Sequence, residues 1–375
     1  MSDACPNGLV DPSTSARNFV PHKLSRTISL VVIFVTVGSL LWSTVLSRHD
    51  LKWSPRVSHQ ESTLRDHLSS LFPYNASGNL PRLIWQTWKT SSQEVEFDPR
   101  FCSAADSWDK LNPEFEHEVI TDAAAAELVH VLFAGVPAVF EAYDALPKPV
   151  LKADFFRYLA LLACGGVYSD IDTTVLKSIS HWIPIELEPF GLGVGIEADP
   201  DRPDWHDWYA RRIQFCQWTI MSKPGHPVLG DIVASITEKT LKRKAQNELQ
   251  PAFMKTVMEF TGPGIWTDSI FNYLKISQLL DESTASNFSA VSWQVFANVR
   301  EPMKLSAVLV LPITSSSPGV GHMGLKSSGD RLAFVSHGFS GNSRDTAPKC
   351  PRMNTDVNAG TWKHDERSVD ARFES

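Results

Sequence analysis

Two features are scarce in this 375-residue sequence, and each scarcity excludes a class of function. The sequence holds five cysteines, none in a Cys-x-x-Cys pair, which disfavours a zinc knuckle. They are Cys5, Cys102, Cys164, Cys216 and Cys350. A basic excess is also missing, because 35 Lys and Arg residues stand against 42 Asp and Glu residues. The net charge of -7 and the lack of a basic stripe argue against a nucleic-acid partner.

Long apolar runs are missing as well, with one exception. Residues 28–46 carry no charge and are about as long as a helix that crosses the hydrocarbon core of a bilayer. A polar tail, 1–27, precedes them, and no small-residue cleavage site follows, so a cleaved signal peptide is disfavoured. The segment is therefore predicted to be a single transmembrane anchor rather than a buried core helix.

The orientation of that anchor depends on weak signals. Lys and Arg residues flank it almost equally on both sides, so the positive-inside rule does not decide. Two glycosylation sequons, at Asn75 and Asn287, both lie after the anchor and are compatible with a luminal C-terminal part. We expect a single-pass type II protein. In an oxidising lumen the last four cysteines form two disulfides or stay buried thiols, and the sequence leaves both open.

The remaining chain divides by composition. Residues 47–79 show little periodicity and are predicted to be a stem, followed by a globular domain over 80–365. Within that domain, residues 340–359 are polar and contain Pro and Gly, which is typical of a loop. Residues 366–375 are predicted to be a polar tail.

The start of the globular domain alternates strands with helices. Strands are predicted over 83–88 and 115–121, with a helix over 100–110 between them. Asp122 is then expected to cap an Ala-rich helix. This alternation predicts an α/β fold with a largely parallel sheet.

A buried helix with two charges comes next. Pro149 suits its first turn and Gly165 its end, and the residues between are apolar on nearly every face. Asp154 and Arg157 lie three residues apart and therefore neighbour each other on one face. Burying charges is costly unless they are paired, so one interpretation is a structural ion pair. The alternative is a functional pair.

The alternative gains weight from the aspartates that follow. Residues 167–172 are predicted to form an apolar strand ending in Asp170 and Asp172, which alternation would place on one side. Paired carboxylates at the carboxyl end of a strand favour a hard cation such as Mn²⁺ or Mg²⁺, which can in turn hold a diphosphate.

The motifs in this region resemble those of glycosyltransferase family 32, and most of all its α-1,6-mannosyltransferases that start outer chains on N-glycans. The resemblance covers roughly 80–365. The matching segments are 81–89, 107–113, 145–149, 154–172, 261–264, 312–327 and 360–363. The family pattern runs almost directly from 337–341 to 360–363, whereas here residues 340–359 intervene, as an inserted loop or a translated intron.

The resemblance implies a GT-A-like, Rossmann-type domain that transfers mannose from GDP-mannose with retention of anomeric configuration, using Mn²⁺ or Mg²⁺. Asp170 and Asp172 would hold the metal and the diphosphate, and Asp154 and Arg157 would contact the donor sugar. Trp85 would lie at the nucleotide base. Two histidines in the C-terminal motifs, His322 and His337, are further candidates for the metal site.

The resemblance also implies a place and an acceptor. We expect a Golgi or ER–Golgi membrane protein with a luminal catalytic domain, acting on N-glycans of glycoproteins. One rival is mannosyl transfer to an inositol-phosphoceramide sphingolipid, although such enzymes usually carry further membrane spans. A second is a non-catalytic sugar-binding protein on the same scaffold. A third, a metal-dependent hydrolase, would need a His-rich ligand set near the aspartates, and the sequence shows none.

Overall fold

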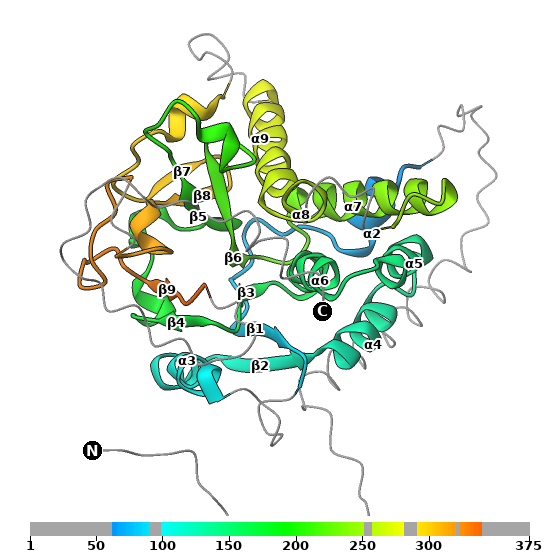
Figure 1. Cartoon of the computed structure of the whole chain (residues 1–375), viewed down its shortest axis with the longest axis horizontal. Coiled ribbons are helices and arrows are strands. Elements are labelled where there is room, and N and C mark those ends of the chain that lie inside the picture. The colour runs from blue at the N-terminus through cyan, green and yellow to red at the C-terminus, as the bar shows by residue number, and fades with distance from the viewer. Residues whose placement is uncertain (1–61, 91–98, 251–256, 281–290, 320–322, 340–375) are drawn as a thin grey trace, which may run out of the picture. The chain divides into compact units, whose positions relative to one another are not determined.

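The computed structural model describes residues 62–90, 99–250, 257–280, 291–319 and 323–339 (Figure 1). The predicted anchor (28–46), His322, the predicted loop (340–359) and the polar tail (366–375) lie outside these residues. Among the residues described, no helix is both long enough and apolar enough to cross a membrane.

A seven-stranded mixed sheet forms the centre of the fold. Its strand order is β2-β1-β3-β6-β5-β8-β7. The strands are β1 (Leu83–Trp88), β2 (Glu116–Thr121), β3 (Gly166–Ser169), β5 (Leu192–Ala198), β6 (Gln214–Ser222), β7 (Met303–Leu305) and β8 (Val308–Leu311). β1 is parallel to β2 and β3, and β5 is parallel to β8.

The prediction of a largely parallel sheet was wrong. β6 runs antiparallel to both β3 and β5, and β7 runs antiparallel to β8. The reason is the connection between β5 and β6, residues 199–213, which contains only the short 3₁₀ helix η3 (Trp205–Asp207). A parallel pair needs a long crossover, usually an α-helix, whereas this connection returns the chain beside β5 in the opposite direction.

Most helices pack on one face of the sheet, and α3 (Pro99–Leu111) packs on the other. The helices are α2 (Leu64–Leu71), α3 (Pro99–Leu111), α4 (Asp122–Leu132), α5 (Pro137–Ala145), α6 (Pro149–Cys164), α7 (Pro227–Ala245), α8 (Val257–Phe260) and α9 (Pro263–Leu280). Residues of α4 to α7 and α9 share the largest core cluster with β1, β3, β5, β6 and β8. The opposite face packs against α3 and a second sheet of two strands, β4 (Thr173–Val175) and β9 (Val335–His337) (Figure 1).

The first predicted elements agree closely with the structure. β1, α3 and β2 match the predicted strand, helix and strand to within a residue or so. The cap of α4 is different, since Thr121 and not Asp122 accepts the hydrogen bond, from the backbone N–H of Ala124 at 3.2 Å. Asp122 lies inside the first turn, where its negative carboxylate interacts favourably with the positive end of the helix dipole.

Helix α6 is buried as predicted and ends where predicted. Gly165 is its C-cap with a φ of 68°, and Gly166 follows with a φ of 99°. A side chain at Gly166 would place its Cβ 2.6 Å from the carbonyl oxygen of Leu83 on the neighbouring strand. The two glycines therefore end the helix and let β3 lie close beside β1.

Residues 62–79, which we predicted to be stem, fold with the domain that we predicted to begin at residue 80. Thr63 and Asp66 form a capping box at the start of α2. Leu68 of this helix is fully buried, and Arg65 pairs with Asp231 and Glu238 of α7 at 2.8 and 3.0 Å. These contacts hold the segment on the domain.

Candidate active site

The two aspartates of the Asp-x-Asp motif lie in a tight turn and not on a strand. β3 ends at Ser169, three residues before the end of the predicted strand at Asp172, so the strand alternation argument was wrong. The backbone carbonyl of Asp170 accepts hydrogen bonds from the N–H and the hydroxyl of Thr173, at 3.1 and 2.5 Å. The Asp170 N–H donates to the carbonyl of Trp218 on β6 at 2.9 Å. These bonds fix the turn at the carboxyl end of β3.

His337 completes a cluster of three potential metal ligands. β9 pairs with β4, so Thr173 lies directly opposite His337, although the two residues are far apart in the sequence. The His337 Nε2 atom lies 3.4 Å from Asp172 Oδ1 and 4.0 Å from Asp170 Oδ2. One ligand atom from each of the three residues lies within 4.8 Å of the other two. Two carboxylates and one imidazole suit Mn²⁺ or Mg²⁺, so the residues fit the ion that the sequence predicts.

Arg157 connects this cluster to Asp154. Its Nη2 atom lies 2.9 Å from Asp154 Oδ1 and 3.3 Å from Asp170 Oδ1, and its Nη1 donates to the carbonyl of Gln217 at 2.9 Å. The guanidinium also lies 4.8 Å from the ring centroid of Tyr168. Burial alone would lower the pKa of Arg157, but Asp170 and Asp154 outweigh it and raise the pKa. The arginine is therefore charged at every physiological pH.

Asp154 is held by partners that the sequence analysis did not identify. Thr261 donates from its hydroxyl to Asp154 Oδ2 at 2.8 Å, and the Gln217 amide nitrogen lies 3.5 Å from Oδ1. The Tyr158 hydroxyl donates to Gln217 Oε1 at 2.7 Å and lies 3.1 Å from the Thr261 carbonyl. The sequence analysis had named 261–264 only as a segment that matches the family. Gly262, next to Thr261, packs so closely that a side chain there would place its Cβ 2.6 Å from Met258 Cα.

The structure does not bring Trp85 to this site. Its side chain is 4% exposed, faces the main helical core, and donates its indole N–H to the carbonyl of Gly165 at 2.9 Å. Trp88 is the tryptophan of β1 that lies beside the motif. It packs in a small cluster with Phe101 and Ile171, and Ile171 is the middle residue between the two aspartates.

Two buried donors in the site have no hydrogen-bond partner among the described residues. They are the indole N–H of Trp218 and the Nε–H of Arg157. Trp218 packs against His337, with 4.8 Å between ring centroids. A buried N–H without a partner is costly, and an oxygen-rich anion such as a diphosphate would satisfy both.

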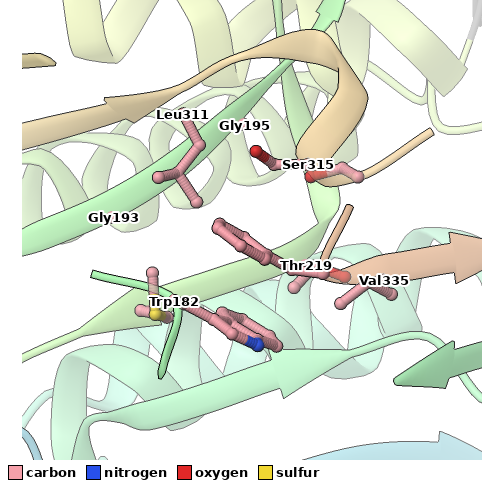
Figure 2. Close-up of a pocket in the computed structure, with 10 residues that line it drawn as sticks. Trp182, Gly193, Gly195, Thr219, Leu311, Ser315 and Val335 are labelled. Carbon is pink, nitrogen blue, oxygen red and sulfur yellow. The ribbon is translucent and has the colours of Figure 1, made fainter. Parts of the chain in front are cut away.

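A small closed cavity on the same face of the sheet is too small to be the substrate site. Figure 2 shows Leu311 and Ser315 on one side of it and Trp182 and Val335 on the other. Its volume of about 10 Å³ is near the minimum for one water molecule, and the Ser315 hydroxyl has no partner among the described residues.

None of the described cysteines belongs to the metal cluster. Cys102, Cys164 and Cys216 form no disulfide with one another. Burial raises the pKa of Cys164 to about 12, and it raises the pKa of Cys216 further. Both thiols are therefore protonated and unreactive.

Comparison with known proteins finds a matching family. Residues 98–187 match the family described as "Glycosyltransferase sugar-binding region containing DXD motif". The matched region contains Asp154, Arg157, Asp170 and Asp172.

Three relatives show how far the similarity extends. Over 298 residues the chain is 47% identical to the initiation-specific alpha-1,6-mannosyltransferase of Candida albicans, covering 76% of this chain and 77% of that protein. The initiation-specific alpha-1,6-mannosyltransferase of Saccharomyces cerevisiae is 33% identical over 405 residues, covering 78% of this chain and 84% of that protein. Similarity to inositol phosphoceramide mannosyltransferase 3 of Schizosaccharomyces pombe is 33% over 98 residues, only 26% of each chain.

Proposed function

The chain belongs to glycosyltransferase family 32, and from that premise we propose that it transfers mannose from GDP-mannose to an N-glycan, forming the α-1,6 linkage that starts an outer chain. It is a glycosyltransferase. The relatives that align over most of their own length are named as α-1,6-mannosyltransferases, which supports this donor sugar and this linkage.

One observation carries the proposal. Arg157 lies between Asp154 and Asp170 and contacts both, so a sugar site and a metal site are joined by one buried cation. A purely structural ion pair would need only Asp154. The second contact, to a carboxylate of the metal cluster, supports a role in donor binding.

A divalent ion fits the cluster of Asp170, Asp172 and His337. When bound, such an ion neutralises the negative charge that develops on the leaving diphosphate. The Nε–H of Arg157 and the indole N–H of Trp218, which have no hydrogen-bond partner among the described residues, would be the donors that the chain offers to the diphosphate. Trp88, at the carboxyl end of β1, offers an aromatic face for the guanine base in the place that we had predicted for Trp85.

We propose that the acceptor hydroxyl attacks from the face that the diphosphate leaves. Retention by double displacement would need a carboxylate free to attack the sugar. Asp154 does not suit that role, because its two oxygens already accept hydrogen bonds from Arg157 and Thr261. Asp154 instead holds Arg157 in place.

The cellular setting is part of the proposal. Residues 28–46 would anchor the protein in the Golgi membrane as a single-pass type II protein, with a GT-A-type catalytic domain in the lumen. Donor and acceptor would then meet in the compartment where secretory glycans are extended.

The alternatives are weaker on specific grounds. The similarities to inositol phosphoceramide mannosyltransferases are short, over 98 and 105 residues. A non-catalytic sugar-binding protein would tolerate loss of site residues, whereas Asp154, Arg157, Asp170, Asp172 and His337 are all present and lie together.

A donor screen tests the function. The full-length protein, purified in detergent with Mn²⁺, would be offered GDP-mannose, GDP-fucose, UDP-glucose and UDP-galactose with an oligomannose N-glycan. We expect transfer from GDP-mannose alone, with a product that an α-1,6-specific mannosidase cleaves. Transfer from a UDP-sugar, or transfer only to inositol phosphoceramide, would overturn the proposal. Asp172→Ala is the inactive control.

A further inference from the structure

The β5–β6 connection, residues 199–213, leaves the sheet at the same edge as the Asp-x-Asp turn. Ala198 at the end of β5 pairs with Gln214 at the start of β6. Further along β6, the carbonyl of Trp218 accepts the hydrogen bond from Asp170. The β6 residues before Trp218 therefore extend past the end of β3, and the connection begins beyond the catalytic turn.

This connection and a later segment present three tryptophans. Trp205 and Trp208 lie in the connection and are partly exposed, and Trp293 of η5 (Trp293–Phe296) is 38% exposed. We call these three residues the indole surface. Arg202 stacks on Trp208 and Arg212 stacks on Trp293, with 4.8 and 4.6 Å to the ring centroids. Each arginine fixes the orientation of one indole.

The two segments of the indole surface are tied together through Asp199. Its Oδ2 accepts the N–H of Asn298 at 2.6 Å, and its Oδ1 lies 3.4 Å from Nη1 of Arg212. The 291–298 segment and the β5–β6 connection therefore form one surface. A ligand at Trp208 and Trp293 would meet a preorganised site, which lowers the entropic cost of binding.

The connection is also joined to the donor-sugar end of the catalytic site. Arg211 pairs with Glu259 at 2.7 Å and with Asp268 at 2.6 Å. Thr261, two residues after Glu259, donates its hydroxyl to Asp154. The indole surface is thus connected through residues 259–261 to the carboxylate that positions Arg157.

Charge decides which ligand suits this surface. Each of the three arginines in residues 199–213 is paired: Arg202 with Asp204, Arg211 with Glu259 and Asp268, and Arg212 with Asp199. The connection therefore offers no uncommitted arginine for a phosphate. It does offer indole faces for the C–H faces of sugar rings and exposed carboxylates, such as Asp201 and Asp207, that accept hydrogen bonds from hydroxyls.

We propose that the indole surface is the acceptor subsite and binds a neutral, mannose-rich glycan rather than a phosphate-bearing lipid headgroup. The proposal rests on the function proposed above and identifies the part of the chain that selects the acceptor. It places acceptor selection in residues 199–213 and 293–298, and donor binding in the residues around Asp170.

The test separates acceptor binding from donor chemistry. The full-length wild type and the variants Trp208→Ala, Trp293→Ala and Trp208→Tyr would be assayed for transfer to an oligomannose N-glycan and for hydrolysis of GDP-mannose without acceptor. Ile276→Ala, an exposed apolar residue on α9, is the control. We expect the alanine variants to raise the KM for the glycan about tenfold or more. GDP-mannose hydrolysis and melting temperature should stay unchanged, and Trp208→Tyr should retain most of the affinity.

Two results would overturn the inference alone, and a third would overturn it together with the proposed function. Alanine variants with a wild-type KM for the glycan would show that the indole surface does not bind it. An equal loss of GDP-mannose hydrolysis would assign the surface to the donor or to the fold. A wild type that transfers mannose to inositol phosphoceramide but not to the glycan would reject the proposed function and this inference together, before any variant is compared.

Discussion

Gln86 donates a hydrogen bond from its side-chain nitrogen to the backbone carbonyl of Asp170, over 3.0 Å. Its side-chain oxygen lies 2.9 Å from Nε2 of His117, and Nδ1 of His117 lies 2.9 Å from Asp109. The amide oxygen and the carboxylate both accept, so the imidazole needs a proton on each nitrogen to complete both bonds. Burial lowers the pKa of His117 and so disfavours this doubly protonated form, whereas the nearby Asp109 raises the pKa and favours it. Gln86 thus connects a surface carboxylate to the catalytic turn.

We predict that this bond positions Asp170 for the metal. Gln86→Leu and Gln86→Glu both lose the donor to Asp170, and both should need roughly 10 to 100 times more Mn²⁺ for half-maximal activity. Only Gln86→Leu also leaves the buried His117 N–H without an acceptor, so it should lose a further ~1–3 kcal/mol of stability. Mn²⁺ titrations and chemical denaturation measure the two effects. An unchanged Mn²⁺ requirement in both variants would show that the bond serves only the fold.

The metal cluster itself predicts a larger effect. Asp172→Asn and His337→Ala each remove one of the three ligand atoms, and we expect turnover to fall more than about 100-fold, beyond the loss expected for a residue that only supports a ligand. The fold should survive, because both residues lie at the edge of the domain, although their side chains are only 13% and 7% exposed. Turnover, Mn²⁺ affinity and melting temperature would be measured. Full activity of either variant, or of the wild type in excess EDTA, would contradict the metal role.

Local patterns predicted the site better than they predicted the sheet. The burial of α6, its end at Gly165 and the nearness of Asp154 to Arg157 all follow from spacing within a few residues. The antiparallel direction of β6 does not follow from such spacing, because it depends on how residues 199–213 return the chain to the sheet. His337 reaches Asp172 only through the pairing of β4 with β9, and only the family resemblance pointed to it.

The choice between the two tryptophans of β1 could be made only in part from the sequence. Alternation along a strand places Trp85 on the face opposite Gln86 and Trp88 on the same face. Gln86 contacts Asp170, so Trp88 shares the face of the catalytic turn. What the sequence lacked was the identity of the buried face, since both faces of β1 carry apolar residues.

The pair of Asp154 and Arg157 gives a test of structural against functional roles. Replacing both with apolar residues of similar volume, Asp154→Leu with Arg157→Met, removes the buried charges together and avoids leaving one of them unpaired. We expect the double variant to melt near the wild-type temperature and to lose turnover. Arg157→Met alone should be less stable by ~3–5 kcal/mol, since it leaves Asp154 without its cation. A fully active double variant would show that the pair is structural.

The predicted topology can be tested at Asn75. This residue is exposed, and its side-chain oxygen accepts the N–H of Ser77 at 3.0 Å in a tight turn, so the sequon is accessible. In a luminal domain Asn75 should carry a glycan, and Asn75→Gln should remove one endoglycosidase-sensitive mass shift. Protease added to sealed microsomes should cleave only the tail before residue 28. Digestion of the catalytic domain in intact vesicles would show that the orientation is the opposite one. The Golgi assignment would then be wrong as well.

The last prediction concerns the stability of the domain at acid pH. His226 is fully buried, and its Nδ1 accepts the backbone N–H of Val228 at the start of α7, over 3.3 Å. Burial, with a smaller contribution from Lys223, lowers the pKa of His226 to about 3. The unfolded chain takes up a proton near pH 6.5, whereas the folded domain does not until about pH 3. Stability from this residue is therefore complete above pH 6.5 and is lost as the pH falls toward 3.

The variant His226→Asn isolates this effect. Asparagine still offers an oxygen that can cap α7, but it does not titrate. We expect the wild type to lose about 2 to 3 kcal/mol more of its unfolding free energy than the variant between pH 7.5 and 4.5. Urea denaturation at both pH values measures the difference, and His181→Asn, at an exposed histidine, is the control. Equal losses in the wild type and His226→Asn would mean that His226 takes up its proton without unfolding the domain, and the acid sensitivity would then have to come from another group.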